Sequence, residues 1–306
     1  MKLGFVFPGQ GAQSVGMGKD LYEKYSEIRE IYDKASEITN KNIAKLTFES
    51  TEEELAETKN TQLAILVMSL GILEVINKKA DISAGLSLGE YTALIHSGII
   101  GFEDGIKIVQ KRGEIMQNEV PEGHWAMAAI IGLDDKTVED LCNQVKSGFI
   151  VPANYNCPGQ VVVSGEYEAV NILMELAKEA GAKKVVELKT GGPFHTSKLL
   201  GAAHNLKMEL NKIKFNVIEN KVIKNLDGTF YSKQDDMSEL LSKHVINPVR
   251  FTLVAQRMLD NGVDTIVEIG PGKSLAGFIK RIDKNVNIIN INNVETLENW
   301  IMKNNC

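Results

Sequence analysis

The chain has few cysteines and no long apolar segment, and both shortages limit what it can be. Cys142, Cys157 and Cys306 are an odd number without metal-ligand spacing, so neither a disulfide framework nor a metal site is expected. Residues 1–7 are too short for the apolar core of a signal peptide, and no apolar run reaches membrane-spanning length. We therefore expect a cytoplasmic protein that does not enter a membrane.

Arginine is also scarce, and acidic residues outnumber basic ones. The net charge of the 306 residues is −6, which argues against a protein dedicated to binding nucleic acid. Only five of the 34 basic residues are arginines, so each arginine is a candidate for planar recognition of an anion. No repeat or low-complexity segment is present, and the 43% of hydrophobic residues are enough for one large domain or for a domain that carries a smaller insert.

What the chain does contain is a short apolar strand that runs into Gly-x-Ser-x-Gly, at residues 82–91 (ISAGLSLGEY). In a nucleophile elbow the serine sits on a strained turn between a strand and a helix, and glycines flank it because the two backbones approach closely. The N-terminus of the following helix points at the reacting carbonyl and stabilises negative charge there. This context favours Ser87 as a nucleophile over a purely structural turn.

Strands that alternate with helices predict an α/β body with a mostly parallel sheet, in which functional residues gather at the carboxyl ends of the strands. The expected strands of this body lie at residues 2–7, 82–85, 221–225 and 265–269. The expected helices lie at residues 19–38, 52–56, 62–77, 88–97, from 102 onward, and at 197–210, 237–245, 251–261 and 274–281.

Between residues 125 and 188 the pattern changes to βαββαβ, the order of the ferredoxin-like split unit. Its expected strands are 126–132, 149–154, 160–164 and 184–188, and its expected helices are 135–146 and 167–180. We expect this unit to form a small subdomain at 123–189. It is inserted into a large catalytic subdomain made of 1–122 and 190–306.

The first strand ends in a glycine-rich turn, Pro8-Gly9-Gln10-Gly11. Gly9 and Gly11 resemble part of a dinucleotide fingerprint, but the third glycine is misplaced and the acidic partner is not evident. The alternative is a loop whose backbone N–H groups and Gln10 amide lie beside another strand end, as an oxyanion site requires.

A serine is a weak nucleophile unless a base takes its proton, so the histidines need sorting. His195 follows Gly-Gly-Pro-Phe and precedes a helix, a position that can overhang the strand ends where Ser87 lies. His96 is inside the elbow helix and is expected to be a packed residue. His244 lies on a helix and can orient another group.

Seven motifs, in order, resemble the acyltransferase family of malonyl-CoA:acyl-carrier-protein transacylases and together cover nearly the whole chain. They are FPGQG, GLSLGE, QKRG, NYNCPGQ, PFH, NPV and EIGPG, which begin at residues 7, 85, 110, 154, 193, 247 and 268. The resemblance implies an α/β-hydrolase-like large subdomain with a ferredoxin-like small subdomain. It also implies malonyl transfer from malonyl-CoA to the phosphopantetheine thiol of acyl carrier protein in fatty-acid synthesis, by a monomer without a metal or other cofactor.

The same resemblance assigns roles to individual residues. Ser87 becomes the acylated nucleophile and His195 its base, and the backbone N–H groups of Gln10 and Leu88 become the oxyanion hole. Arg112 holds the malonyl carboxylate, for which a bidentate guanidinium is better suited than a lysine. A surface ion pair is the alternative for Arg112. Further substrate-binding candidates are Gln62, Asn156 and His244.

Several positions depart from the family's usual pattern. Leu86 stands where histidine usually precedes the nucleophile, Trp125 where glycine is frequent, and His244 where glutamine is common. In the family the main-chain carbonyl at the last of these positions orients the catalytic histidine, and a second imidazole there can shift the pKa of His195. Phe194, just before His195, resembles malonyl-selective rather than methylmalonyl-selective members.

Three other functions are weighed against this one. A serine hydrolase of esterase or thioesterase type would need a carboxylate that orients His195, and it would have no use for an arginine such as Arg112 beside the acyl group. A transferase that acts in trans on a polyketide assembly line shares the motifs. A non-catalytic subunit that docks acyl carrier protein would not need an intact Ser87, His195 and Arg112.

Overall fold

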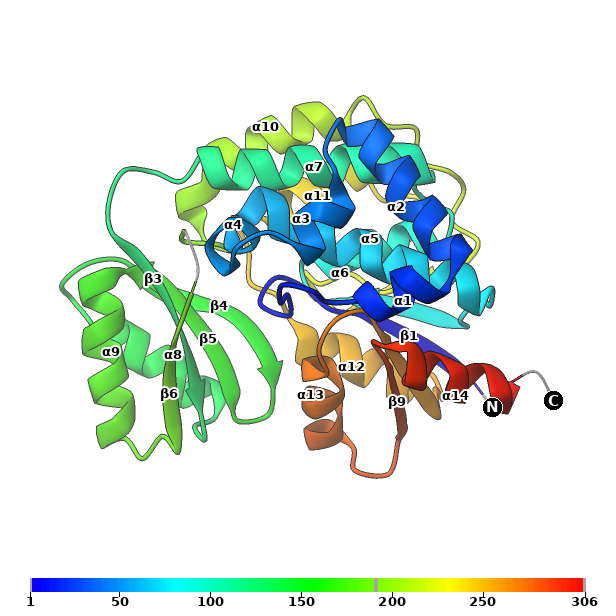
Figure 1. The fold of residues 1–306 in the computed structure, drawn as a ribbon. Coiled ribbons are helices and arrows are strands. Elements are labelled where there is room, and N and C mark those ends of the chain that lie inside the picture. Colours follow the sequence, from blue (N-terminus) through cyan, green and yellow to red (C-terminus); the bar gives the residue numbers. More distant parts are fainter. Residues whose placement is uncertain (1, 190–191, 305–306) are drawn as a thin grey trace.

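The computed structural model describes residues 2–189 and 192–304, which form two lobes, each built on its own sheet (Figure 1). The large lobe contains a five-stranded sheet whose pairings are all parallel. In spatial order its strands are β7 (Lys221–Val222), β2 (Ile82–Gly85), β1 (Leu3–Phe7), β8 (Thr265–Ile269) and β9 (Asn287–Ile291). The chain adds β2 and β7 on one side of β1 and β8 and β9 on the other, so the strand order reverses at β1, where α/β sheets place their sites.

Helices cover both faces of this sheet, which explains why β1 is an unbroken apolar run. Phe5 and Phe7 belong to the core shared with α5 (Thr58–Ile76) and α6 (Leu88–His96). Val6 points the opposite way, into the core shared with α12 (Phe251–Asp260) and α13 (Ser274–Ile282). Figure 1 shows α12 and α13 below the sheet and α5 and α6 above it.

The remaining helices of the large lobe pack around this centre. They are α1 (Lys19–Lys24), α2 (Ser26–Thr39), α3 (Ile43–Phe48), α4 (Glu52–Ala56), α7 (Phe102–Asn118), the 3₁₀ helix η1 (Ser197–Leu199), α10 (Leu200–Leu210), α11 (Met237–His244) and α14 (Val294–Asn304).

The small lobe is an antiparallel sheet in the spatial order β4 (Ile150–Cys157), β5 (Gln160–Glu166), β3 (Trp125–Ile131) and β6 (Lys184–Leu188). One face of this sheet is covered by α8 (Asp135–Gln144) and α9 (Tyr167–Glu179). Along the chain the elements follow the order βαββαβ. Because side chains alternate along β3, Ala128 and Ile130 pack on those helices while Met127 and Ala129 line a cleft on the other face. The predicted α/β fold with a ferredoxin-like unit is confirmed.

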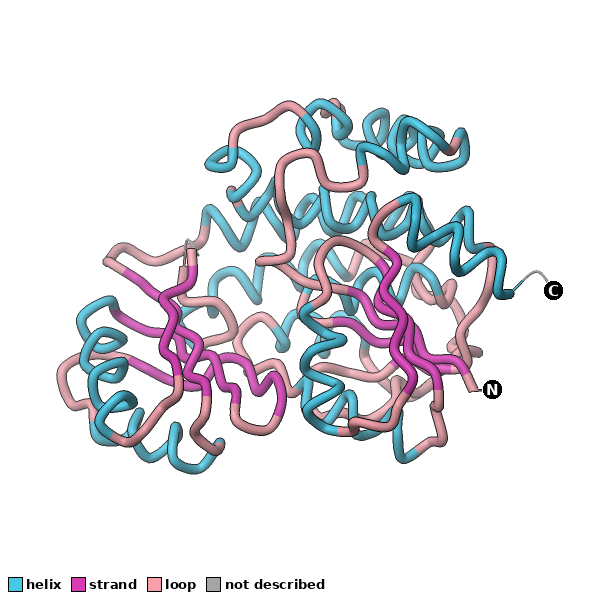
Figure 2. The backbone as a smooth tube through the Cα atoms, turned by 60° about the horizontal axis from the view of Figure 1, so that its bottom comes forward, coloured by secondary structure: helices cyan, strands magenta, loops and turns pink. Residues whose placement is uncertain are grey.

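The two sheets are separate bodies of strands, as the tube in Figure 2 makes visible. Among residues 2–189 and 192–304, the isolated bridge between Asn154 and Val249 is the one strand-type pairing that joins the lobes. Its hydrogen bonds run from Tyr155 N to the Val249 carbonyl and from Val249 N to the Ala153 carbonyl, at 2.8 and 2.9 Å. We retain the subdomain division at 123–189 as a proposal that follows this separation.

The predicted helix at 19–38 is wrong in one respect, because it is two helices that meet at Tyr25. The Tyr25 backbone is extended, with φ −107° and ψ 122°. The Arg29 guanidinium donates to the carbonyls of Tyr22 and Glu23 at 2.9 Å, so the end of α1 is satisfied without helix continuation.

Helix α5 begins four residues before its predicted start, because its first turn is polar and gives no apolar signal. Thr61 donates to the Leu55 carbonyl at 2.5 Å and Asn60 to the Glu54 carbonyl at 2.8 Å, which satisfies these side chains inside the protein. Its 19 residues are long and apolar enough to cross a membrane, contrary to the expectation from sequence, but 78% of the 18-residue window is buried inside the protein. The helix is the centre of the large-lobe core.

Other boundaries also differ. Strand β7 ends at Val222 rather than Asn225, the predicted helix at 197–210 starts as the 3₁₀ helix η1, and α3, β9 and α14 were not predicted. Asn225 lies beyond the end of β7, and its side chain accepts a hydrogen bond from the elbow.

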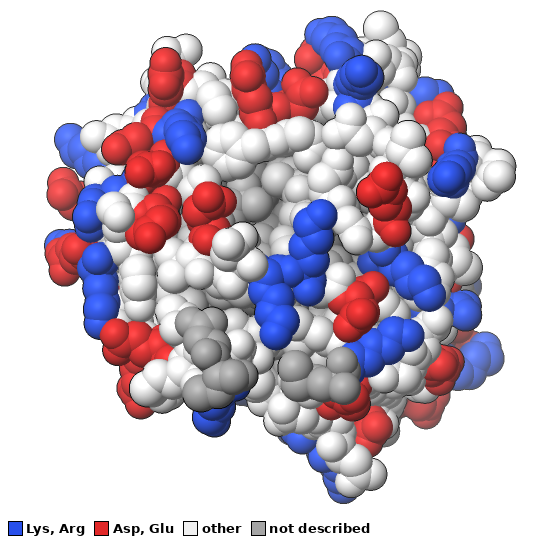
Figure 3. Space-filling view, turned by 90° about the vertical axis from the view of Figure 1, so that its right-hand side faces the viewer, with Lys and Arg blue, Asp and Glu red and all other residues white. Residues whose placement is uncertain are grey.

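The face seen in Figure 3 carries acidic and basic side chains side by side, as expected for a chain with 24% charged residues. On this face no broad surface of one sign is formed.

Candidate active site

A cleft of about 250 Å³ lies where the carboxyl ends of β1 and β2 face the small lobe. Both lobes contribute to its wall, and the lining includes Gly9, Gln10, Gln62, Leu86, Ser87, Met116, Met127, Asn156, Phe194 and His195. Strand order had predicted functional residues at this edge of the sheet, and the cleft is found there.

Ser87 sits at the N-cap of α6 with φ 53° and ψ −101°, a conformation that few non-glycine residues adopt. A Cβ on Gly85 would lie 2.0 Å from the Gly89 carbonyl carbon, and one on Gly89 would lie 2.0 Å from the Phe7 carbonyl oxygen. Strand and helix therefore touch at backbone distance, which only glycine permits. The predicted nucleophile elbow is confirmed in its geometry.

The loop after β1 packs directly on this elbow. A Cβ on Gly9 would lie 2.3 Å from the Leu86 carbonyl oxygen, so glycine brings the Gln10 backbone beside the nucleophile. Leu88 is the first residue of α6, and the first N–H groups of a helix have no partner within the helix. A dinucleotide loop would lead straight into a helix, but α1 begins only at Lys19, so that alternative is wrong.

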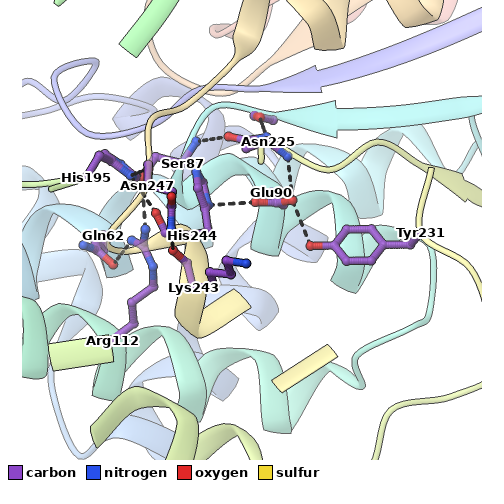
Figure 4. Close-up of polar contacts among 11 residues, drawn as sticks. Gln62, Ser87, Glu90, Arg112, His195, Asn225, Tyr231, Lys243, His244 and Asn247 are labelled. Atoms are coloured by element: carbon purple, nitrogen blue, oxygen red, sulfur yellow. Dashed lines mark hydrogen bonds and ion pairs between the residues drawn. The ribbon is translucent and has the colours of Figure 1, made fainter. Parts of the chain in front are cut away.

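His195 lies against the nucleophile (Figure 4). Its Nε2 is 2.9 Å from Ser87 Oγ, and its Nδ1 is 3.0 Å from the His244 carbonyl and 3.2 Å from the Asn247 carbonyl. A carbonyl oxygen only accepts, so Nδ1 carries the proton and donates. Nε2 is left with its lone pair toward the serine hydroxyl, as a general base requires.

The surroundings keep this imidazole uncharged. Burial is the largest cause that lowers the pKa of His195 well below its ordinary value, and the charges of His244 and Arg112 lower it further. The two carbonyl hydrogen bonds oppose this shift without cancelling it. His195 is therefore neutral and able to take a proton near neutral pH.

Arg112 is only 1% exposed, which makes the alternative of a surface ion pair wrong. Its Nη1 donates to Gln62 Oε1 at 2.7 Å, its Nη2 donates to Ser87 Oγ at 3.0 Å, and its Cζ lies 5.2 Å from the centre of the Tyr91 ring. Its buried Nε has no hydrogen-bond partner. Arg112 itself lies just behind the cleft wall, bonded to two residues that line it, Gln62 and Ser87. Burial lowers the pKa of its guanidinium, so an anion that reached it from the cleft would offset part of the cost of burying this charge.

The other predicted binding residues fall into two places. Gln62 holds the Arg112 fork, and Asn156 lines the cleft with a buried Oδ1 that has no partner. His244 lies behind His195, with ring centres 4.9 Å apart, and is not among the residues that line the cleft. Its place fits orientation of His195 better than contact with a substrate.

Asn225 is a residue of the site that the sequence analysis missed. Its Oδ1 accepts from Ser87 N at 2.8 Å, its Nδ2 donates to the Gly85 carbonyl at 2.7 Å, and its own N–H donates to Glu90 Oε1 at 3.0 Å. These bonds satisfy the backbone on both sides of the strained turn. The available signal was its position at the end of a predicted strand, on the same sheet edge as Ser87.

Two of the unusual residues have structural partners. The Trp125 indole donates to the Pro121 carbonyl at 2.8 Å, and its ring lies 5.8 Å from Lys198 Nζ, three residues beyond His195. Leu86 is half-buried and lines the cleft. Within residues 2–189 and 192–304, no group of three or more His, Cys, Asp and Glu side chains is placed to hold a metal ion.

A parallel α/β sheet with a serine on a nucleophile elbow and a histidine bonded to it defines a protein of the acyl-transferring or acyl-hydrolysing class that works through a serine. Comparison with known proteins narrows this class. The chain belongs to the acyl transferase domain family, whose match spans residues 4–297. The resemblance inferred from the seven motifs is confirmed.

Curated and solved relatives cover almost all of the chain. Malonyl CoA-acyl carrier protein transacylase from Bacillus subtilis (strain 168) is 39% identical over 302 residues, which are 97% of this chain and 95% of that protein. A solved malonyl CoA-acyl carrier protein transacylase from Clostridium perfringens is 43% identical with a TM-score of 0.93, covering 99% of this chain and 97% of that one. A malonyl-transacylase solved in complex with a type II PKS acyl-carrier protein is 35% identical with a TM-score of 0.95, covering 99% and 100%.

Proposed function

We propose that this protein transfers a malonyl group from malonyl-CoA to the phosphopantetheine thiol of acyl carrier protein, through a malonyl ester of Ser87. The observation that carries the proposal is the buried Arg112 guanidinium, which lies 3.0 Å from the nucleophile oxygen and has a free Nε. A carboxylate separated from the reacting carbonyl by one methylene group, as in malonyl-CoA, is what such a group would recognise.

In the first half-reaction, Ser87 Oγ attacks the thioester carbonyl while His195 Nε2 takes the serine proton. The carbonyl oxygen gains negative charge, which we assign to the backbone N–H groups of Gln10 and Leu88. When the intermediate collapses, the C–S bond breaks and His195 returns its proton to the thiolate of CoA. The malonyl group is then an ester of Ser87, and His195 is again neutral.

The second half-reaction runs the same steps in reverse order with a different thiol. His195 takes the proton from the phosphopantetheine thiol, the thiolate attacks the malonyl ester, and the proton returns to Ser87 Oγ as the ester bond breaks. The serine and the histidine are thus restored at the end of each cycle. No metal or redox cofactor takes part in the reaction as proposed.

The geometry favours transfer over hydrolysis as the function. His195 Nδ1 faces two main-chain carbonyls instead of the carboxylate that a hydrolase triad would supply. Acyl carrier protein as the acceptor is supported by the relative solved in complex with such a carrier. A transferase acting in trans on a polyketide assembly line would use the same site and differ only in its carrier.

The test is an assay of the purified protein with malonyl-CoA and the phosphopantetheine-bearing acyl carrier protein. We expect malonyl-carrier to form in proportion to the CoA released, with slow CoA release when the carrier is omitted. Rapid release of free malonate without a carrier would identify a hydrolase. Elution as a single chain on size exclusion and recovery in the cytoplasmic fraction are the accompanying expectations for a cytoplasmic monomer.

A further inference from the structure

A buried polar contact behind the dyad joins the helix that carries the nucleophile to the helix that orients the base (Figure 4). Glu90 lies in the first turn of α6, three residues after Ser87, and its side chain is 2% exposed. His244 is the last residue of α11, and its side chain is 3% exposed. Its Nδ1 is 3.0 Å from Glu90 Oε2.

The two oxygens of Glu90 have different partners. Oε1 accepts from Asn225 N at 3.0 Å and from the Tyr231 hydroxyl at 2.8 Å. Oε2 accepts no hydrogen bond of good angular geometry. The group that faces it is His244 Nδ1. A carboxylate buried to this extent needs an opposite charge or a hydrogen-bond donor. We therefore assign a proton to His244 Nδ1, which donates it to Glu90 Oε2.

His244 also contacts the base, through its main chain. Its carbonyl oxygen accepts from His195 Nδ1 at 3.0 Å, and its ring centre lies 4.9 Å from the His195 ring centre. His244 therefore contacts α6 through its side chain and His195 through its carbonyl. Any residue at this position could offer its carbonyl to His195. Where that carbonyl lies relative to Ser87, however, depends on the group that the His244 side chain contacts.

We propose that His244 is a positioning residue whose side-chain contact with Glu90 fixes its base-orienting carbonyl relative to Ser87. The inference rests on the proposed function in that Ser87 and His195 are taken as the acylating pair. It extends that function by a residue whose side chain does not line the cleft.

The charges around the base act in one direction. His244 on α11 and Arg112 on α7 both face His195 and both lower its pKa, after burial as the largest cause. Glu90 faces the His244 ring, with its Oε2 3.0 Å from His244 Nδ1. Tyr91 and Tyr231, the other titratable groups beside Glu90, have pKa values raised mainly by burial and stay neutral.

The experiment compares His244→Gln and His244→Leu with the wild type. Glutamine can donate from its amide to Glu90, whereas leucine removes the donor. Lys243→Gln is the matched control, because it changes the neighbouring, exposed residue of the same helix end. Thermal unfolding of each variant shows which of them fold.

The readout is the rate of Ser87 phosphonylation by a fluorophosphonate, which needs no malonyl group. In that reaction the serine oxygen bonds to phosphorus, fluoride leaves, and His195 takes the serine proton. We expect His244→Leu to react about 10- to 100-fold more slowly than wild type, as misplacement of a catalytic group does. We expect His244→Gln to recover most of the wild-type rate, because its amide can still donate a hydrogen bond to Glu90.

Wild-type reactivity in His244→Leu would overturn the positioning role, and so would equal slowing in both folded variants. Slowing of Lys243→Gln to the same extent as His244→Leu would show a general effect of this helix end and would also overturn the role of the His244 side chain. Failure of malonyl transfer is seen separately: a wild type that reacts with the fluorophosphonate but transfers no malonyl contradicts the proposed function alone. A wild type that does neither contradicts both.

Discussion

Replacing Arg112 with alanine tests the substrate assignment, since this side chain is the buried group that a malonyl carboxylate would meet. Its fork can give the carboxylate two charge-assisted hydrogen bonds at a side chain that is only 1% exposed. Losing such a pair costs roughly 2 to 5 kcal/mol, which is about 30- to 4000-fold in rate at 1.4 kcal/mol per tenfold. Arg112→Ala should lower malonyl transfer by a factor in this range.

The same substitution has a second effect that does not depend on the substrate. It leaves Gln62 Oε1 without its 2.7 Å donor and Ser87 Oγ without its 3.0 Å donor. The cost of such unpaired groups, about 1 to 3 kcal/mol each, falls on malonyl-CoA and acetyl-CoA alike. The ratio of the two rates cancels this shared cost and isolates the contact with the carboxylate.

The assay therefore measures the kcat/KM of malonyl-CoA and of acetyl-CoA in wild type and variant. The ratio of malonyl to acetyl kcat/KM should fall by about two orders of magnitude, because both substrates bear the shared cost but only malonyl-CoA loses a partner for its carboxylate. Arg250→Ala is the matched control, because Arg250 also lies over a tyrosine ring, at 4.9 Å from that of Tyr155, and Tyr155 does not line the cleft. An equal fall for both substrates in Arg112→Ala would refute the carboxylate role.

Three further predictions concern the dyad and its support. Asn225→Ala removes the partners of Ser87 N and the Gly85 carbonyl, so the free energy of unfolding should drop by about 2 to 4 kcal/mol and kcat should fall; denaturant unfolding at wild-type stability would count against the clamp. His195→Ala should cost several orders of magnitude in rate but add little to Ser87→Ala, and fully additive losses would argue against a dyad. Because the pKa of His195 lies well below its ordinary value of 6.5, kcat/KM should stay flat as pH falls through 6.5 and decline only at lower pH, and an acid midpoint at or above 6.5 would contradict the burial argument.

The sequence predicts those parts of the molecule whose cause is local. Strands β6 and β8 and helix α4 lie at their predicted residues, because alternation, apolar runs and the Thr51 cap are read from neighbouring positions. The elbow was predictable as well, since backbone contact demands glycine at 85 and 89.

Long-range contacts set the parts that were not predicted. Asn225 bonds to Ser87, which is 138 residues away in the sequence, and His244 contacts Glu90 from another helix. Because neither contact follows from a local spacing, the sequence predicts neither. Strand β9 has asparagine at both 287 and 290, and only its parallel pairing with β8 shows that it belongs to the sheet. Arg112 was found through a motif, but its burial and its bond to Gln62 needed the fold.

The measurement that tests the central claim most directly is the intact mass of the protein after mixing with malonyl-CoA in the absence of carrier. The wild type should gain one malonyl-sized adduct, located on the peptide that contains Ser87, and should lose it when the thiol of acyl carrier protein is added. Ser87→Ala should gain no adduct. An unmodified wild type, or an adduct that persists in Ser87→Ala, would contradict the account.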